Sequence, residues 1–271
     1  MILPPFQGPR LKVKRARKHI AEFAESVTAF GERVKLGMFP VGETETMIDY
    51  VVQFSEEPPE ELPMLIGDAI HNLRAALDIM VCDIARLRGK SSDKLKFPFA
   101  ADAEMLERIL KKDFPRLGPD VVEAIRSQHP YIGGNLALRG LHDLDIDDKH
   151  ETVLPYYLVA EGRVNLPQAF HDLMRQTVGF GLEDFTTPIH AGGRCVVPKG
   201  TNPWSIVRPL SKPRPEFPRG LPFEEAPIVE VLEGLAQVVD EVVESFAAKF
   251  GGGDLNPTIA PVADDQSVDG G

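Results

Sequence analysis

The segment from residue 62 to 88 constrains the fold most, because it combines a helical apolar seam with ionisable residues beside that seam. The apolar positions recur at spacings of four and three: Ile66, Ile70, Leu73, Leu77, Met80, Ile84 and Leu87. This periodicity predicts an amphipathic helix with one buried face. At about 100° per residue, His71, Arg74 and Asp78 fall on a narrow arc that adjoins the seam. Ionisable groups in such a place need partners, because an unpaired buried charge is costly.

Two further segments show an unbroken seam of the same kind. One runs from Val13 to Val34 and is ended by Gly37 and Pro40, and the other runs from Val229 to Phe250. Shorter helices are expected near residues 103–111, 119–128 and 134–149. Because the three seams are short and separated by unlike segments, we expect an intramolecular bundle rather than a coiled-coil dimer.

The remaining segments have β character. Residues 44–54 and 152–159 read as strands, with Pro155 placing the second at a sheet edge or bulge. Prolines recur between residues 198 and 227 and exclude long helices there, which leaves 194–197 and 205–208 as short strands. The predicted fold is α+β, mainly a helical bundle with a small antiparallel β layer.

The predicted domain organisation is a single domain over residues 1–250. Its helical bundle spans residues 9–150 and includes the C-terminal helix 228–250, and the β-rich segment 151–227 packs on the bundle. Residues 251–271 are rich in Gly and Asp, a composition that predicts a disordered tail.

Composition excludes several classes of protein. The chain of 271 residues has a formal net charge of −11, which argues against general nucleic-acid coating but leaves room for a local basic patch. Cys82 and Cys195 have neither metal-ligand spacing nor the density of a disulfide scaffold. We see no signal peptide in Met1–Arg10 and no run of membrane-spanning length. The expected location is the cytoplasm, with no membrane partner.

A local basic patch does occur at the start of the first helix. Its members are Arg10, Lys12, Lys14, Arg15, Arg17 and Lys18. One interpretation is a solvated helix face. The other is a binding surface that faces phosphate in RNA, DNA or a nucleotide. A protein partner or a homodimer also stays open.

The helix predicted at 134–149 brings a second set of polar residues. Its apolar stripe of Ala137, Leu141 and Leu144 continues onto Asp148, so a carboxylate occupies the next core position. If this helix packs on the first one, Asp148 meets Arg74 or His71 in a charge-assisted hydrogen bond. Asn72 lies on another side of its helix.

Two hypotheses explain this polar set. In the first it is a buried lock that fixes helix register. In the second, a pocket is lined by His71, Arg74, Asp78, Asp148 and His150. Histidine and carboxylate would then supply acid–base chemistry, and arginine would bind phosphate or carboxylate.

A third hypothesis, a metal-binding site, rests on two carboxylate–histidine pairs. Asp68 and His71, like Asp147 and His150, are spaced by one helical turn, as in bundled di-metal proteins. The helical wheel turns Asp147 and His150 away from the stripe, and aspartate is shorter than the usual glutamate ligand. We therefore predict no metal ligands and leave the cofactor unknown.

The string Gly67-Asp68-Ala69-Ile70-His71-Asn72-Leu73-Arg74-Ala75-Ala76-Leu77-Asp78 resembles the signature of a widespread family of uncharacterised bacterial and phage proteins. The family pairs an HNLR-x-ALD helix with a later DKH segment, here within Leu141–His150. Phe97-Pro98-Phe99 and Gln128-His129-Pro130-Tyr131 are also similar. By analogy the resemblance singles out His71, Asn72, Arg74, Asp78, Asp148, Lys149 and His150. It implies no activity.

A more distant resemblance is to the HEPN superfamily, helical bundles that include metal-independent RNases. Their signature, Arg followed after four to six residues by His, is absent: Arg15 and His19 are separated by three residues. An assembled site would use Arg74 with His150. The leading functional hypothesis is a binding or regulatory module. The alternatives are a metal-independent RNase or other phosphate-ester hydrolase and, behind it, a metal-dependent enzyme.

Overall fold

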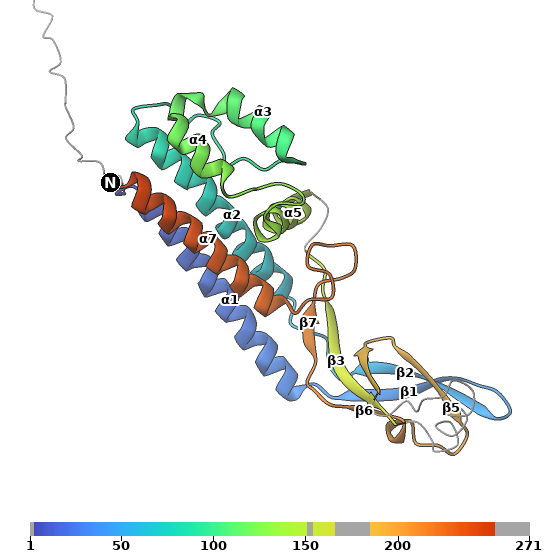
Figure 1. Ribbon diagram of the computed structural model, residues 1–271. Coiled ribbons are helices and arrows are strands. Elements are labelled where there is room, and N and C mark those ends of the chain that lie inside the picture. The colour runs from blue at the N-terminus through green and yellow to red at the C-terminus, as the bar shows by residue number, and fades with distance from the viewer. Residues whose placement is uncertain (1–2, 151–153, 166–184, 253–271) are drawn as a thin grey trace, which may run out of the picture.

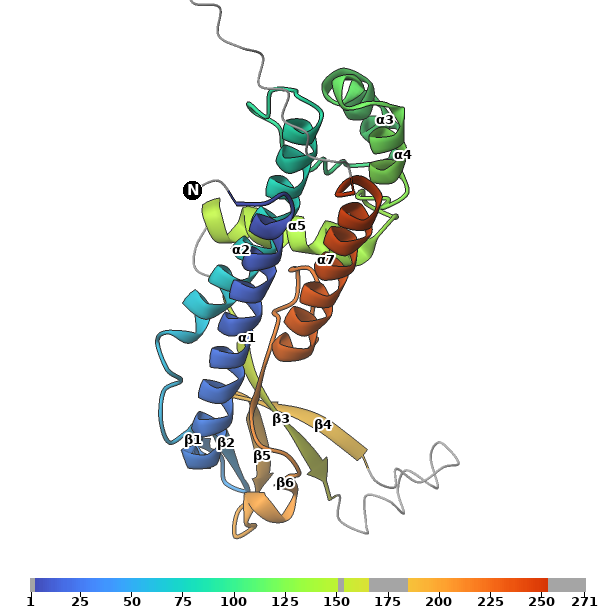
Figure 2. The same ribbon diagram turned by 90° about the vertical axis from the view of Figure 1, so that its left-hand side faces the viewer.

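Three long helices form an elongated stem. The structure is a computed structural model that describes residues 3–150, 154–165 and 185–252. Helices α1 (Gln7–Arg33), α2 (Leu62–Leu87) and α7 (Ile228–Phe250) lie side by side, and α5 (Leu136–His150) crosses α2 and α7 (Figures 1 and 2). One end of the stem carries α3 (Ala103–Asp113) and α4 (Pro119–Arg126), and the opposite end carries the strands.

The stem is held by the three apolar seams. The seam of α2 is buried along its length, and it packs in one continuous core with Phe23 of α1 and Phe246 of α7. Each buried side chain of this size contributes about 1.5–3 kcal/mol relative to exposure. The predicted helical seams are confirmed, as is the α+β class of the fold.

Helices α3 and α4 cap the far end of the stem. Asp102 begins α3, because its carboxylate accepts a hydrogen bond of 2.7 Å from the amide of Met105. A short 3₁₀ turn at Pro115–Leu117 joins the two helices. Leu106, Leu110 and Val121 are buried in the stem core, so this end is part of the same core.

The strands form two antiparallel sheets. The first contains β1 (Leu36–Glu43), β2 (Met47–Phe54) and β5 (Arg194–Pro198), in the order β1-β2-β5. In the second, β3 (Tyr157–Val164) pairs with β4 (Phe185–His190), β6 (Val207–Pro209) and β7 (Arg214–Glu216). Val52, Ala160 and Ile189 are buried together in a small core distinct from that of the stem.

The β part differs from the sequence prediction in several places. Residues 36–43 were expected only to end the first helix, yet they form β1, whose register shifts between Pro40 and Gly42. The predicted bundle range 9–150 therefore contains a β hairpin. Pro155 precedes β3 and is not part of the strand. The sequence prediction did not include β4 or β7. Pro203–Ser205 forms a 3₁₀ turn that ends before β6. The predicted tail lies outside the described residues from position 253 onward.

Two helical glycines provide a test of packing in the stem. A Cβ on Gly140 of α5 would lie 2.3 Å from the ring of Phe223, whereas a Cβ on Gly234 of α7 meets nothing within 4 Å. Gly140→Ala should lower the free energy of unfolding by about 1–2 kcal/mol, because overpacking outweighs the gain in helix propensity. Gly234→Ala should raise it by about 0.5–1 kcal/mol. Urea denaturation measures both, and equal effects of the two variants would contradict the close contact at Gly140.

Candidate functional site

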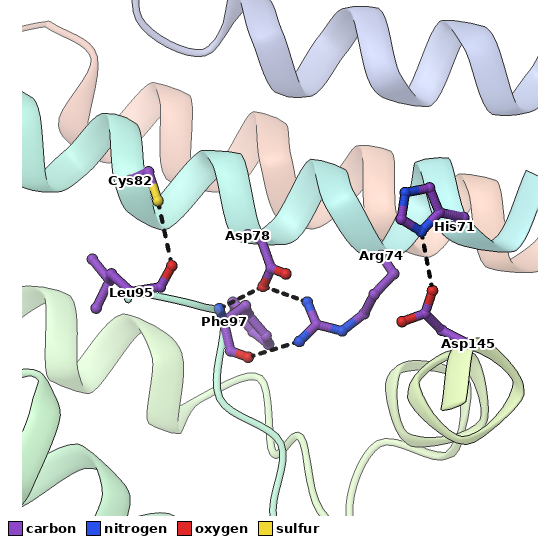
Figure 3. Close-up of polar contacts among 7 residues, drawn as sticks. All are labelled: His71, Arg74, Asp78, Cys82, Leu95, Phe97 and Asp145. Atoms are coloured by element: carbon purple, nitrogen blue, oxygen red, sulfur yellow. Dashed lines mark hydrogen bonds and ion pairs between the residues drawn. The ribbon is translucent and has the colours of Figure 1, made fainter. Parts of the chain in front are cut away.

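Arg74 and Asp78 of α2 tie a loop to the helix. The guanidinium of Arg74 donates from Nη1 to Asp78 Oδ1 at 2.5 Å and from Nη2 to the carbonyl oxygen of Phe97 at 3.2 Å (Figure 3). The same Asp78 oxygen accepts the amide N–H of Phe97 at 2.8 Å. Arg74 is only 7% exposed. The three residues form a closed set of charge-assisted hydrogen bonds, which are stronger than neutral ones.

One aromatic ring covers the guanidinium, and a second ring stacks on the first. The Arg74 Cζ lies 4.5 Å from the centre of the Phe99 ring, a cation–π distance. The imidazole of His142, on α5, stacks on Phe99 with ring centres 4.5 Å apart and planes 2° from parallel. Arg74, Phe99 and His142 therefore join α2, the loop and α5.

His142 is held neutral by this environment. Burial, and after it the positive charges of Arg74 and Arg139, lower the pKa of His142 from its usual 6.5 to about 4. Its buried Nδ1 has no hydrogen-bond partner among the residues that the structure describes. The sequence pattern does not single out His142 or Phe99 as site residues, because the contact between them depends on how α5 crosses α2.

His71 lies beside this set and faces solvent. Its Nδ1 lies 3.4 Å from Asp145 Oδ1 of α5 (Figure 3). The side chain of His71 is 51% exposed, whereas that of Asp145 is 7% exposed. A buried carboxylate thus orients a half-exposed imidazole, whose other nitrogen is left for solvent or a ligand.

The carboxylates pair differently from the sequence prediction. Asp148 was expected to meet Arg74 or His71, but Asp78 bonds Arg74 and Asp145 faces His71. Asp148 lies against the backbone of α2, where a Cβ on Gly67 would be 2.5 Å from its Oδ1. Gly67 therefore permits the close approach of α5 to α2.

Other predicted residues are separated from this cluster. Asn72 lies on another side of α2, as the helical wheel indicated, and the structure shows that it faces α1. Its Oδ1 accepts from Lys12 Nζ at 3.0 Å, and its amide donates to the Asp68 carbonyl at 2.7 Å. Lys149 and His150 end α5, and their side chains lie outside the described part of the structure. Their assignment to the site stays a prediction.

The N-terminal basic surface is largely engaged within the chain. Arg10 forms an ion pair with Glu244 at 2.6 Å, and Arg17 forms one with Asp240 at 2.9 Å, both across to α7. Lys18 lies 3.4 Å from Glu22, and Arg15 Nε donates to His19 Nε2 at 2.9 Å. Lys14 is exposed. These ion pairs weaken the expectation that the surface binds phosphate, and that expectation stays a prediction.

The described residues contain neither a metal-binding cluster nor a helix that could span a membrane. No group of three or more His, Cys, Asp or Glu side chains there is arranged to hold a metal ion. No helix in that part of the chain has the length and apolar character needed to cross a membrane.

The buried ion pair predicts a large effect on stability. Arg74→Gln should lower the free energy of unfolding by about 2–4 kcal/mol, because it leaves a partly buried Asp78 without its cation. The matched control is Arg108→Gln, which removes an ion pair of the same i,i+4 spacing whose side chains are 65% and 78% exposed. The control should cost at most about 0.5 kcal/mol. Comparable losses of unfolding free energy in the two variants would rule out a structural lock formed by Arg74 and Asp78.

His142 predicts a pH dependence of stability. Below pH 6.5 the unfolded chain binds a proton at this histidine, whereas the folded chain binds one only near pH 4. The His142 contribution is therefore complete above pH 6.5 and is lost as the pH falls toward 4. His142→Gln should reduce the fall in melting temperature over this range, and a control substitution at the exposed His190 should leave it unchanged. An identical slope in His142→Gln would contradict the neutral buried imidazole.

Comparison with protein-family models, with curated proteins and with solved structures finds no match to this chain. The two resemblances noted in the sequence therefore stay hypotheses. The function has to be argued from the geometry of the side chains themselves.

Proposed function

We propose that the protein is a non-enzymatic binding or regulatory module, with the polar cluster between α2 and α5 acting as its structural lock. The observation that carries this proposal is the enclosure of Arg74. Its guanidinium bonds Asp78 and the Phe97 carbonyl, and Phe99 covers it. A cation held in this way is not free to bind a substrate phosphate, which is the role that a phosphate-ester hydrolase would require of it.

The rest of the cluster supports a structural role. Arg139 of α5 donates to the Ala100 carbonyl at 3.1 Å and pairs with Asp143. Ala100 in turn donates its amide to the Pro130 carbonyl at 3.0 Å. Arg74 and Arg139 thus each bond a loop carbonyl as well as a carboxylate. We further propose a cytoplasmic location, which fits the two free cysteines.

One observation favours the hydrolase as a second candidate. His71 is half exposed and is oriented by the buried Asp145, and this arrangement suits a histidine that takes a proton from a water molecule. In this alternative His71 is the general base, and a cation other than Arg74 has to stabilise the phosphoryl charge.

Substitution of His71 decides between the two candidates. Under the binding-module proposal, the wild-type protein leaves labelled single-stranded RNA intact. His71→Gln then changes the free energy of unfolding by at most about 1 kcal/mol, because the imidazole is half exposed. Gel analysis of the RNA and urea denaturation measure the two quantities. RNA cleavage that is lost in both His71→Gln and Asp145→Asn, but kept in Arg108→Gln, would replace the module with the hydrolase.

A further inference from the structure

A basic groove lies at the β end of the stem, outside the cluster described above. It has a volume of about 790 Å³ and opens between the end of α1, the start of β1 and residues 202–213. Figure 2 shows β6 near this lower end of α1. The side chains that matter for its chemistry are Lys35, Asn202, Trp204, Ser205, Arg208 and Lys212.

The charge of the groove contrasts with that of the chain. Three cations line it, although the chain carries a net charge of −11. Lys212 lies 3.5 Å from Glu32, and both side chains are exposed. Among the described residues, no carboxylate forms an ion pair with Lys35 or Arg208. The residue opposite Arg208 on β3 is Arg163, so that position supplies no countercharge. The groove therefore has cationic capacity that the described part of the chain does not neutralise.

The indole of Trp204 is placed in the groove wall by a short, capped turn. Asn202 Oδ1 accepts the amide N–H of Trp204 at 3.0 Å, and Ser205 Oγ donates to the Asn202 carbonyl at 2.6 Å. Pro203, the first residue of the turn, is buried. Because the backbone on both sides of the indole is fixed, little ordering is needed before a flat ring can stack on it.

The groove walls are also anchored to the sheets. The amide of Lys35 donates to Ser55 Oγ at 2.9 Å, which fixes the start of β1. On the other wall, the amide of Glu161 donates to Ser211 Oγ at 2.8 Å, and the amide of Leu210 donates to the Glu161 carbonyl at 2.7 Å. The cations thus project from two walls that hydrogen bonds hold in place.

We propose that this groove binds a nucleotide unit, with its base stacked on Trp204 and its phosphate held by Arg208 together with Lys212 or Lys35. An aromatic platform beside cations is the recognition chemistry of single-stranded nucleic acid and of nucleotides. The inference rests on the proposed function as a binding module and supplies the chemical class of the ligand. The ligand has two sources, a free nucleotide and a single strand, which the experiment separates.

Trp204 makes the experiment direct, because it is the only tryptophan of the chain. Intrinsic fluorescence of the full-length protein is followed during titration with AMP, with a single-stranded oligoadenylate of about ten nucleotides, and with inorganic phosphate. Quenching by the oligonucleotide is expected, and its affinity should fall with salt at a log–log slope of about 2 for three cations. Quenching by AMP at equal affinity identifies the free nucleotide as the ligand. The absence of quenching by both, or the same response to phosphate alone, overturns the proposal.

Variants locate the binding site. Arg208→Gln should weaken oligonucleotide binding at least about fivefold and reduce the salt slope by about 0.7. Trp204→Leu should weaken it about tenfold, as followed by anisotropy of a fluorescein-labelled strand. The matched control is Lys199→Gln, which removes a cation that directly follows β5 and pairs with Glu43 outside the groove. Equal weakening in the control and in Arg208→Gln would assign binding to diffuse charge and overturn the site. Circular dichroism melts check that each variant is folded.

The same samples separate this inference from the proposed function. Strands that are bound and remain intact on a gel support both. Bound strands that are cleaved, with cleavage but not binding lost in His71→Gln, preserve the groove and overturn the non-enzymatic role. Strands that are neither bound nor cleaved overturn the groove alone.

Discussion

The ion pair between Arg74 and Asp78, together with their shared hydrogen bonds to Phe97, is the interaction on which the upper part of the stem depends. It fixes the loop that follows α2, although that loop has little regular structure of its own. Farther along the loop, the amide of Ala100 donates to the Pro130 carbonyl, and the carbonyl of Ala100 accepts from Arg139. This series of bonds links α2 through the loop to Arg139 of α5. A cation with several fixed acceptors suits this task, because arginine presents several donors in a rigid plane.

The charge of Arg74 also affects the ionisable side chains around it. A buried guanidinium repels a second positive charge nearby, and this repulsion together with burial keeps His142 neutral and stacked on Phe99. His71 lies in a different environment, because it faces solvent and the buried Asp145. Two histidines of one cluster are therefore placed in opposite environments, one suited to packing and the other to contact with a ligand or solvent.

The sequence predicted the helical part of the fold well. Apolar spacing is set by the geometry of a helix, so the three seams identified the stem helices to within a few residues. The polar flank of α2 was also identified, including the proximity of Arg74 to Asp78. The facing partners were not: Asp145 rather than Asp148 meets His71, because that pairing depends on the crossing of α2 and α5. β1 was missed because Gly37 and Pro40 are residues that normally end structure. The groove was beyond the sequence, since its residues come from distant segments whose own patterns carry no shared period.

The two separate apolar cores have a consequence for how such a chain changes over time. Effects of substitutions add independently when the residues share no contacts. The small core of Val52, Ala160 and Ile189 does not share its buried side chains with the stem. Residues around it are therefore free to vary without loosening the helices. An ancestral chain of this design would keep its stem while the strand end acquired new ligands, so divergence between descendants should be concentrated at one pole of the molecule.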